Sequence, residues 1–416
     1  MKARRSEASD VRGGLVFPLA WLAVAAAHAA IVALRLVASP AMPWWELMPF
    51  WAYTAAMAAV WALHASGVWR FDRQLFLIPA LLVGLGLAMQ FRMGTLAEGR
   101  GTGFALSIPL GFAAMAIVFL AASGGRWRLL RGVGGLCYIL AIAALGAMLA
   151  FGRRYRGGIY LPGNINPSEI IKPLLVVFLA SRLARQGGRR KSSGGGLMGV
   201  LALWAVPMLL VLALRDLGLL VLLGATFLAM LYAAEKRISH LIVGALAVAA
   251  ACAGLCMVSA HARVRFDVWL HPFSDPTGSG WQILQSLSAM NAGGIWGAGI
   301  GAGTPQSVPI ASSDFIYAVM AEELGIVVCA LVLILYWRFF TQSWKMGACI
   351  KDPFGSLLAF GMTAAIALQT VVNLGGVTKA IPLTGIALPF LSQGGSSLAT
   401  SLAMVGLLMA MDDEPR

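Results

Sequence analysis

Residues 236–265 read KRISHLIVGALAVAAACAGLCMVSAHARVR, an apolar run with basic residues on both sides. A helix of about 20 apolar residues spans the hydrocarbon core of a bilayer. Lipid offers the backbone no hydrogen-bond partner, so such a run is expected to be a helix, whose peptide groups bond to one another. The stretch therefore predicts a transmembrane helix over 239–259.

Eleven further windows have the same character, so the sequence predicts an all-α, polytopic helical bundle with about 12 transmembrane helices. Hydrophobic residues make up 59% of the 416 residues and charged residues only 12%, where a soluble protein carries about 25% charge. The twelve windows are 14–38, 44–65, 74–92, 104–122, 133–151, 166–183, 197–214, 216–233, 239–259, 314–340, 354–374 and 387–411.

The basic residues predict the orientation of these helices. With the N-terminus placed in the cytoplasm and the helices alternating, cytoplasmic segments carry 20 Lys and Arg residues and outer segments carry 9. Positive residues favour the cytoplasmic side, so both termini are expected there. The formal net charge of +14 is spread over short loops rather than one face. That distribution indicates contact with membrane lipids and excludes nucleic acid as a partner.

The connection over 260–313 is the longest in the chain and falls on the outer side. It is rich in Gly, Ser and Pro, as in HPFSDPTGSG at 271–280. Loops of this length are commonly functional or disordered. Four aromatic residues argue for order, because their rings suit the headgroup level of a membrane. They are Trp269, Phe273, Trp281 and Trp296.

Ionisable residues at membrane depth are costly and are functional candidates. Glu322 and Glu323 predict a structural or proton-linked polar cluster within the bundle. Most of the other candidates are expected near the outer surface of the membrane. The candidates there include Glu169, Asp216, Asp314 and Lys379, together with Arg153, Arg154, Arg156, Arg263 and Arg265, whereas Lys172 is expected inside a helix.

The outer arginines run against the positive-inside pattern, and two explanations remain open. Guanidinium groups pair well with phosphate oxygens, so an anionic ligand would hold them there. Contacts with lipid headgroups or with Glu169, Asp216 and Asp314 would also do so. Asp314 has two explanations as well. It follows Ser312 and Ser313 at the start of an apolar window, where an aspartate either caps the helix or acts as a general base.

Four segments, in this order and spacing, resemble the SEDS family (shape, elongation, division and sporulation), the group of RodA, FtsW and SpoVE. The resemblance covers about 156–411. The segments are NPSEIIKPLLVVFLA at 166–180, RDLG at 215–218, RVRFDVWLHPFSDPTGSGWQILQSLSAMNAGGIWGAGIG at 263–301 running into SDFIYAVMAEELG at 313–325, and IPLTGIALPFLSQGGSS at 381–397.

The resemblance implies a peptidoglycan glycosyltransferase that polymerises lipid II at the outer face of the bacterial cytoplasmic membrane. It implies that Asp314 is the catalytic aspartate. It also implies a substrate-binding set, to which the outer position of Lys379 adds a cation for the pyrophosphate. That set is Arg156, Glu169, Lys172, Asp216, Arg263, Arg265, Asp275, Gln285, Lys379 and Ser396, and Glu323 also falls on a family motif position.

The chain departs from the family pattern at several positions. Ser312 and Ser313 stand where members commonly have His-Thr, and Gln393 stands where they have Tyr. Arg215 replaces a proline, and Gly157 replaces an aromatic residue. Five predicted spans precede the Pro-Ser-Glu helix, where members commonly have three. The expected organisation is therefore residues 1–152 as N-terminal transmembrane helices and residues 153–416 as the catalytic core, with ten family spans and about two additional ones.

The resemblance also implies partners. The substrates would be lipid II and a glycan held by undecaprenyl pyrophosphate, and a class B penicillin-binding protein would cross-link the product. The sequence shows no dedicated metal cage, and a divalent cation such as Mg or Mn is left open as a cofactor. Two other functions stay open. A flippase for lipid-linked precursors would depend on the deep charges, and a scaffold for the transpeptidase would need neither these nor Asp314.

Overall fold

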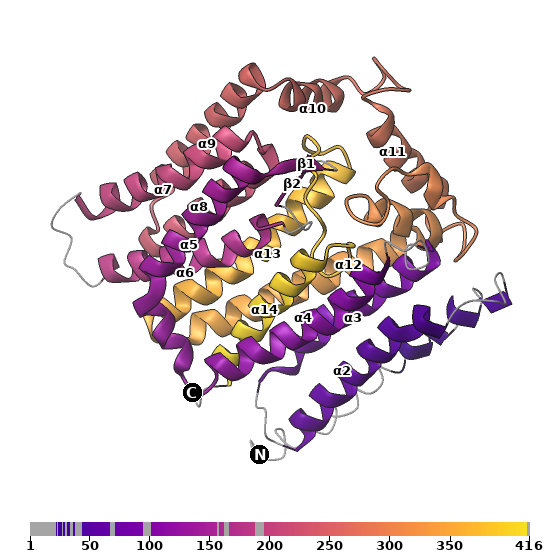
Figure 1. Cartoon of the computed structure of the whole chain (residues 1–416), viewed down its shortest axis with the longest axis horizontal. Coiled ribbons are helices and arrows are strands. Elements are labelled where there is room, and N and C mark those ends of the chain that lie inside the picture. Colours follow the sequence, from indigo (N-terminus) through magenta and orange to yellow (C-terminus); the bar gives the residue numbers. More distant parts are fainter. Residues whose placement is uncertain are drawn as a thin grey trace.

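The computed structural model describes residues 44–66, 71–94, 101–155, 158–161, 166–187 and 195–413, with scattered residues between 22 and 37. Their main elements are helices that run side by side (Figure 1). The helices are η1 (Trp44–Leu47), α2 (Met48–Ala65), α3 (Arg73–Arg92), α4 (Gly101–Ala122), η2 (Arg126–Leu129), α5 (Leu130–Phe151), α6 (Ser168–Gly187), α7 (Gly195–Leu214), α8 (Leu217–Glu235), α9 (Ile238–Val258), α10 (Ala260–Leu270), α11 (Trp281–Gly293), η3 (Pro305–Ser307), α12 (Ile316–Cys349), α13 (Pro353–Val377) and α14 (Gly395–Asp412).

The polytopic helical fold predicted from the sequence is confirmed. Eleven of the twelve predicted windows coincide with a helix, and the window 14–38 lies mostly outside the described residues. Within the described part of the chain, seven helices are long and apolar enough to cross a membrane, and α4 and α7 contain shorter apolar stretches. Strands β1 (Arg153–Tyr155) and β2 (Gly158–Tyr160) form a small antiparallel hairpin between α5 and α6.

The tight turn between α7 and α8 depends on two residues. Arg215 adopts the left-handed conformation with φ 56°, which reverses the chain. Asp216 then caps α8, because its carboxylate accepts a hydrogen bond of 3.0 Å from the Leu219 amide. Asp is a favoured residue at this position. The predicted division of this long apolar stretch into two spans is therefore confirmed.

The helices differ in how much of their surface faces outward. Only 6% of the apolar window of α9 and 28% of that of α5 is buried. In contrast, 83% of the window of α3 is buried, as is 72% of that of α14, which packs along α4. Helices with apolar, unburied faces suit contact with lipid chains.

Segments that the alternating topology assigns to opposite sides of the membrane lie at opposite ends of the bundle. At one end the backbone amide of Asp72 donates to the carboxylate of Asp412, with N···O 2.6 Å. At the other end Trp269 of α10 donates to the carbonyl of Lys379, with Nε1···O 3.0 Å. Figure 1 shows α10 and α11 gathered at this second end. The predicted outer loop 260–313 is thus ordered, and its aromatic residues Phe273 and Trp296 are exposed.

The predicted helix over 387–411 is wrong in its first part. Helix α14 begins only at Gly395, and residues 381–394 form an irregular re-entrant segment. Leu388, Phe390 and Leu391 of this segment are buried. Gly86 of α3 permits the approach, since a Cβ there would lie 2.7 Å from the Leu391 carbonyl oxygen. Irregular backbone at membrane depth is tolerated where it is buried in protein.

Helix α12 is broken at Gly325, whose φ of 77° and ψ of 174° are not helical. This region of conformational space is essentially restricted to glycine. The break lies against the turn after α11, where the Ile326 amide donates to the carbonyl of Gly294 at 3.0 Å. A Cβ on Gly325 would collide with the backbone nitrogen of Gly297. The position therefore requires glycine for its conformation and for its packing.

We expect Gly325→Ala to lower the stability of the protein by about 1–3 kcal/mol or more, because the strained conformation and the backbone clash add. Thermal unfolding of the purified protein in detergent measures the effect. Gly254→Ala on α9 is the matched control, because a Cβ there meets nothing within 4 Å. Equal thermal midpoints for the two variants would contradict the conclusion that position 325 requires glycine.

Candidate active site

A cavity of about 420 Å³ opens among α10, α11, the end of α13 and the re-entrant segment. Its lining combines apolar side chains with a carboxylate and two basic side chains. Asp314, Arg265 and Lys379 are the three charged residues of this lining, and each was predicted from the sequence. The other lining residues are His261, Val264, Val268, Trp269, Gly278, Ser279, Trp281, Gln282, Ile283, Ile310, Gly376, Ile381, Leu383 and Gly385.

The Asp314 carboxylate and the Arg265 guanidinium converge on Gly385. A Cβ built on this glycine would lie 3.2 Å from Nη2 of Arg265 and 3.6 Å from Oδ2 of Asp314. Gly385 has φ 74° and leaves this space open. Arg265 is fixed by a hydrogen bond of 2.7 Å from its Nη1 to the Thr384 carbonyl. A cation is thereby held beside the carboxylate at the cavity wall.

The capping explanation for Asp314 is wrong. The N-cap position of α12 is Phe315, and no side chain caps that helix end. Asp314 lies before the helix, in a turn, and is 9% exposed. Burial raises the pKa of its carboxyl to about 6, although a hydrogen bond from Ser313 and the charge of Arg265 lower it. A carboxyl with this pKa is ionised at neutral pH yet basic enough to accept a proton.

Two other residues of the cavity wall have unusual backbone conformations. Lys379 has φ 62° and Ile310 has φ 52°. A positive φ is a genuine outlier for a β-branched residue such as Ile310. Strain of this kind clusters at functional sites, where the surrounding structure holds it. Both outliers line the same cavity as Asp314.

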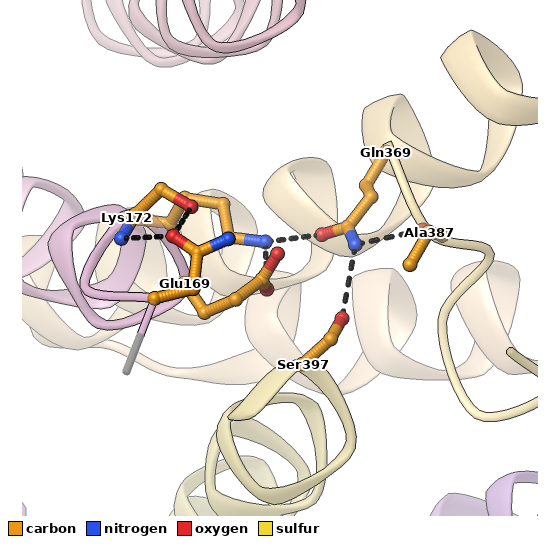
Figure 2. Close-up of polar contacts among 7 residues, drawn as sticks. Glu169, Lys172, Gln369, Ala387 and Ser397 are labelled. Atoms are coloured by element: carbon orange, nitrogen blue, oxygen red, sulfur yellow. Dashed lines mark hydrogen bonds and ion pairs between the residues drawn. The ribbon is translucent and has the colours of Figure 1, made fainter. Parts of the chain in front are cut away.

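Glu169 and Lys172 lie elsewhere, in a buried network inside the bundle (Figure 2). The Lys172 ammonium donates to the Glu169 carboxylate and to the Gln369 side-chain oxygen. Gln369 in turn donates to the Ala387 carbonyl at 2.9 Å and to the Ser397 hydroxyl at 3.3 Å. Glu169 and Lys172 are 8% and 3% exposed. The pair therefore connects α6 with α13, the re-entrant segment and α14.

Several other predicted site residues have local partners. Asp216 caps α8, as described above. Arg263 donates from Nε to the Cys256 carbonyl at 3.2 Å and from Nη2 to that of Met257 at 2.9 Å, at the end of α9. Asp275 is exposed and accepts from the Ser279 amide at 2.8 Å. Hydrogen bonds from Ser279 lower the pKa of Asp275.

Two further predicted residues that the structure describes have no place in the cavity wall. Gln285 of α11 and Ser396 of α14 are half-buried and do not line the cavity. Arg156 lies outside the described residues. Among the described residues, no group of three or more His, Cys, Asp and Glu side chains could hold a metal ion.

Glu322 and Glu323 hold the loop that follows α11. Glu322 accepts from the Thr304 amide at 2.9 Å. Glu323 accepts from the Gly301 amide at 3.3 Å and pairs with Arg92 at 3.1 Å. Of the two predictions for this pair, the contacts favour the structural cluster, because both carboxylates are engaged in fixed contacts.

Four residues near the site were missed by sequence reasoning. Gln90, Asn373 and Ser392 bond to the backbone around Asp314, and Gln369 bonds to Lys172. All four are uncharged and buried. Their position inside predicted spans was the available signal, but an uncharged polar residue costs far less to bury than a charge and marks a site less clearly.

Comparison with known proteins gives a consistent result. A family model described as "Cell cycle protein" (FTSW_RODA_SPOVE) matches residues 72–416. The peptidoglycan glycosyltransferase RodA of Mycobacterium tuberculosis is 35% identical over 360 residues, which cover 81% of this chain and 77% of that protein. A probable peptidoglycan glycosyltransferase FtsW of Geobacter sulfurreducens is 31% identical, with 83% and 96% covered.

Two solved structures share the fold. One comes from work described as "Structural coordination of polymerization and crosslinking by a peptidoglycan synthase complex", with TM-score 0.68 and 25% identity. It covers 82% of this chain and 97% of that chain. The other is the crystal structure of the rod shape determining protein RodA of Thermus thermophilus, with TM-score 0.60 and 23% identity, covering 82% and 96%.

We expect Lys172→Met to destabilise the protein by about 3–5 kcal/mol, because it leaves the Glu169 carboxylate buried without its cation. The double variant Glu169→Gln with Lys172→Met removes both charges and should recover most of that loss. Thermal unfolding in detergent compares the two. A single variant as stable as the wild-type protein would show that the pair is not a structural one.

Proposed function

Because the chain belongs to the FtsW, RodA and SpoVE family of cell cycle proteins, we propose that it is a peptidoglycan glycosyltransferase with its active centre in the cavity around Asp314. The observation that carries this proposal is the arrangement of Asp314, Arg265 and Lys379 around one cavity. A glycosyl transfer that inverts its donor requires one base and stabilisation of the leaving group. The three residues supply both.

In the proposed reaction the growing glycan is the donor and lipid II is the acceptor. Asp314 accepts the proton of the 4-hydroxyl group of the lipid II sugar. The oxygen then attacks the anomeric carbon of the donor and forms a β-1,4 bond, while the bond from that carbon to the pyrophosphate oxygen breaks. The pyrophosphate leaves with the electron pair on its prenyl carrier. Arg265 and Lys379 stabilise its negative charge.

The orientation follows from the charge distribution. The excess of Lys and Arg on the end opposite the cavity supports a cytoplasmic position for that end and for both termini. The cavity then opens at the outer face of the bacterial cytoplasmic membrane, where the polymer is made. We propose a class B penicillin-binding protein as the partner that cross-links it. The similarity to a peptidoglycan synthase complex that coordinates polymerization and crosslinking supports this partner.

The fixed contacts of the deep charges weigh against the flippase alternative. Lys172 is engaged by Glu169 and Gln369, and Glu323 by Arg92. A transport path would require such charges to face moving substrate. The scaffold alternative would leave the cavity and its charged residues without a role. An assay of lipid II polymerisation distinguishes the glycosyltransferase, flippase and scaffold functions.

We expect Asp314→Asn to reduce lipid II polymerisation at least about 100-fold, the usual contribution of a general base. The assay uses purified protein with its class B partner, and the thermal midpoint verifies the fold. Asp267→Asn, an exposed acid on α10, is the matched control and should remain active. If Asp314→Asn makes glycan, the base lies elsewhere and Asp275 is tested next. If the wild-type protein makes none with its partner, the transporter and scaffold functions gain support.

The rate should also depend on pH through Asp314. The base must be ionised, so kcat/KM should rise with pH below about 6 and level off above that value. Arg265 lowers the pKa of Asp314, so Arg265→Gln should move this limb to higher pH. Initial rates measured from about pH 4.5 to 8 in steps of ~0.5 define this rising part of the pH–rate profile, because such steps resolve a single titration. A limb that stays in place in Arg265→Gln would contradict the assignment of the titrating group.

A further inference from the structure

Three consecutive carbonyl groups lead up to the candidate base, and each accepts a hydrogen bond from a side chain of a different element. Gln90 of α3 donates from Nε2 to the Ser312 carbonyl at 2.6 Å. The Ser392 hydroxyl of the re-entrant segment donates to the carbonyl of Ser313. Asn373 of α13 donates from Nδ2 to the Asp314 carbonyl at 3.0 Å.

The three donors are themselves held in place. Gln90, Asn373 and Ser392 are 0%, 3% and 4% exposed. Asn373 donates a second hydrogen bond, of 2.7 Å, to the Ile386 carbonyl. The Ser392 hydroxyl also accepts from the Leu388 amide at 2.8 Å. Buried side chains with several partners lose their rotameric freedom, so they fix whatever they bind.

The segment that carries Asp314 needs such support. Residues 308–314 form bends and turns ahead of α12, so the hydrogen bonds of that helix do not fix their carbonyl groups. The segment contains the left-handed Ile310, a conformation that persists only where its surroundings enforce it. The Gln393 amide adds a further hydrogen bond, of 2.8 Å, to the Ser312 carbonyl. The side chains and this amide together replace the missing helical contacts.

We propose that Gln90, Asn373 and Ser392 are positioning residues that clamp the backbone of Ser312, Ser313 and Asp314 and so aim the carboxylate into the cavity. This rests on the proposed function, in which Asp314 is the base. A displacement of about 1 Å at a reacting group costs on the order of 100-fold in rate.

The test removes each donor while keeping the size of the side chain. Gln90→Met and Asn373→Leu lose the amide and keep similar volume, and Ser392→Ala loses a single oxygen. We expect kcat of lipid II polymerisation to fall about 10- to 100-fold, since the base is misplaced. KM for lipid II should stay within about twofold, because the three donors lie behind Asp314 and do not line the cavity.

The matched control is Thr370→Val on α13. Thr370 is buried and donates only within its own helix, to the Ile366 carbonyl at 2.9 Å. It should keep the wild-type kcat. The proposal is overturned if folded variants keep kcat within about twofold of the wild type, or if their loss of rate is matched by Thr370→Val. Thermal midpoints identify any variant that does not fold, and Ser392→Ala, the smallest change, then decides.

Asp314→Asn, measured alongside, separates this proposal from the proposed function. If Asp314→Asn is inactive and the clamp variants keep kcat, the clamp fails and the base stands. If Asp314→Asn is active, the base assignment fails and the clamp fails with it. If each clamp variant is slow and the double variant Gln90→Met with Asp314→Asn is no slower than Asp314→Asn alone, the donor acts through that carboxylate.

Discussion

Lipid offers no hydrogen-bond partner to a peptide group, and this constraint governs the part of the bundle that is not helical. The re-entrant segment 381–394 is largely buried among spanning helices, so its carbonyl groups must find partners in the protein. Gln369 bonds to Ala387 and Asn373 to Ile386. The two donors are four residues apart on α13 and therefore share one face of that helix. One stripe of α13 thus holds the irregular backbone on which the cavity depends.

The choice of donors follows from electrostatics. Burying an unpaired charge is far more costly than burying an amide that has partners. Neutral side chains accordingly hold the carbonyl groups of Ser312, Ser313 and Asp314, and two charged pairs lie deeper in the bundle. Lys172 is buried between Glu169 and Gln369, and Arg92 pairs with Glu323. Arg265 and Lys379 line the cavity, where an anionic substrate can reach them.

The sequence predicts the parts of this structure that charge and hydropathy determine. Hydropathy predicted the spans, the scarcity of charge made Asp314, Arg265 and Lys379 candidates among other ionisable residues, and the family resemblance then singled out Asp314. The irregular backbone of the re-entrant segment could not be predicted from hydropathy, because its residues are as apolar as those of a span. Gly385 and Pro389 signalled a break that the apolar composition concealed. Neutral donors such as Asn373 were missed because a single polar residue in an apolar helix does not reveal what it binds.

Helix α3 links the two ends of the bundle. At the end of the bundle away from the cavity, the carboxylate of Asp72, the N-cap residue of α3, accepts a hydrogen bond from Gln342. Its last turn carries Gln90 and Arg92, which bond to Ser312 and Glu323 on either side of Asp314. The match to the family begins at Asp72, at the N-cap of this helix. Helix α2 precedes that match and packs on α3, where Tyr53 donates to the Ala80 carbonyl at 3.0 Å, so the match begins at a span that itself contacts the site.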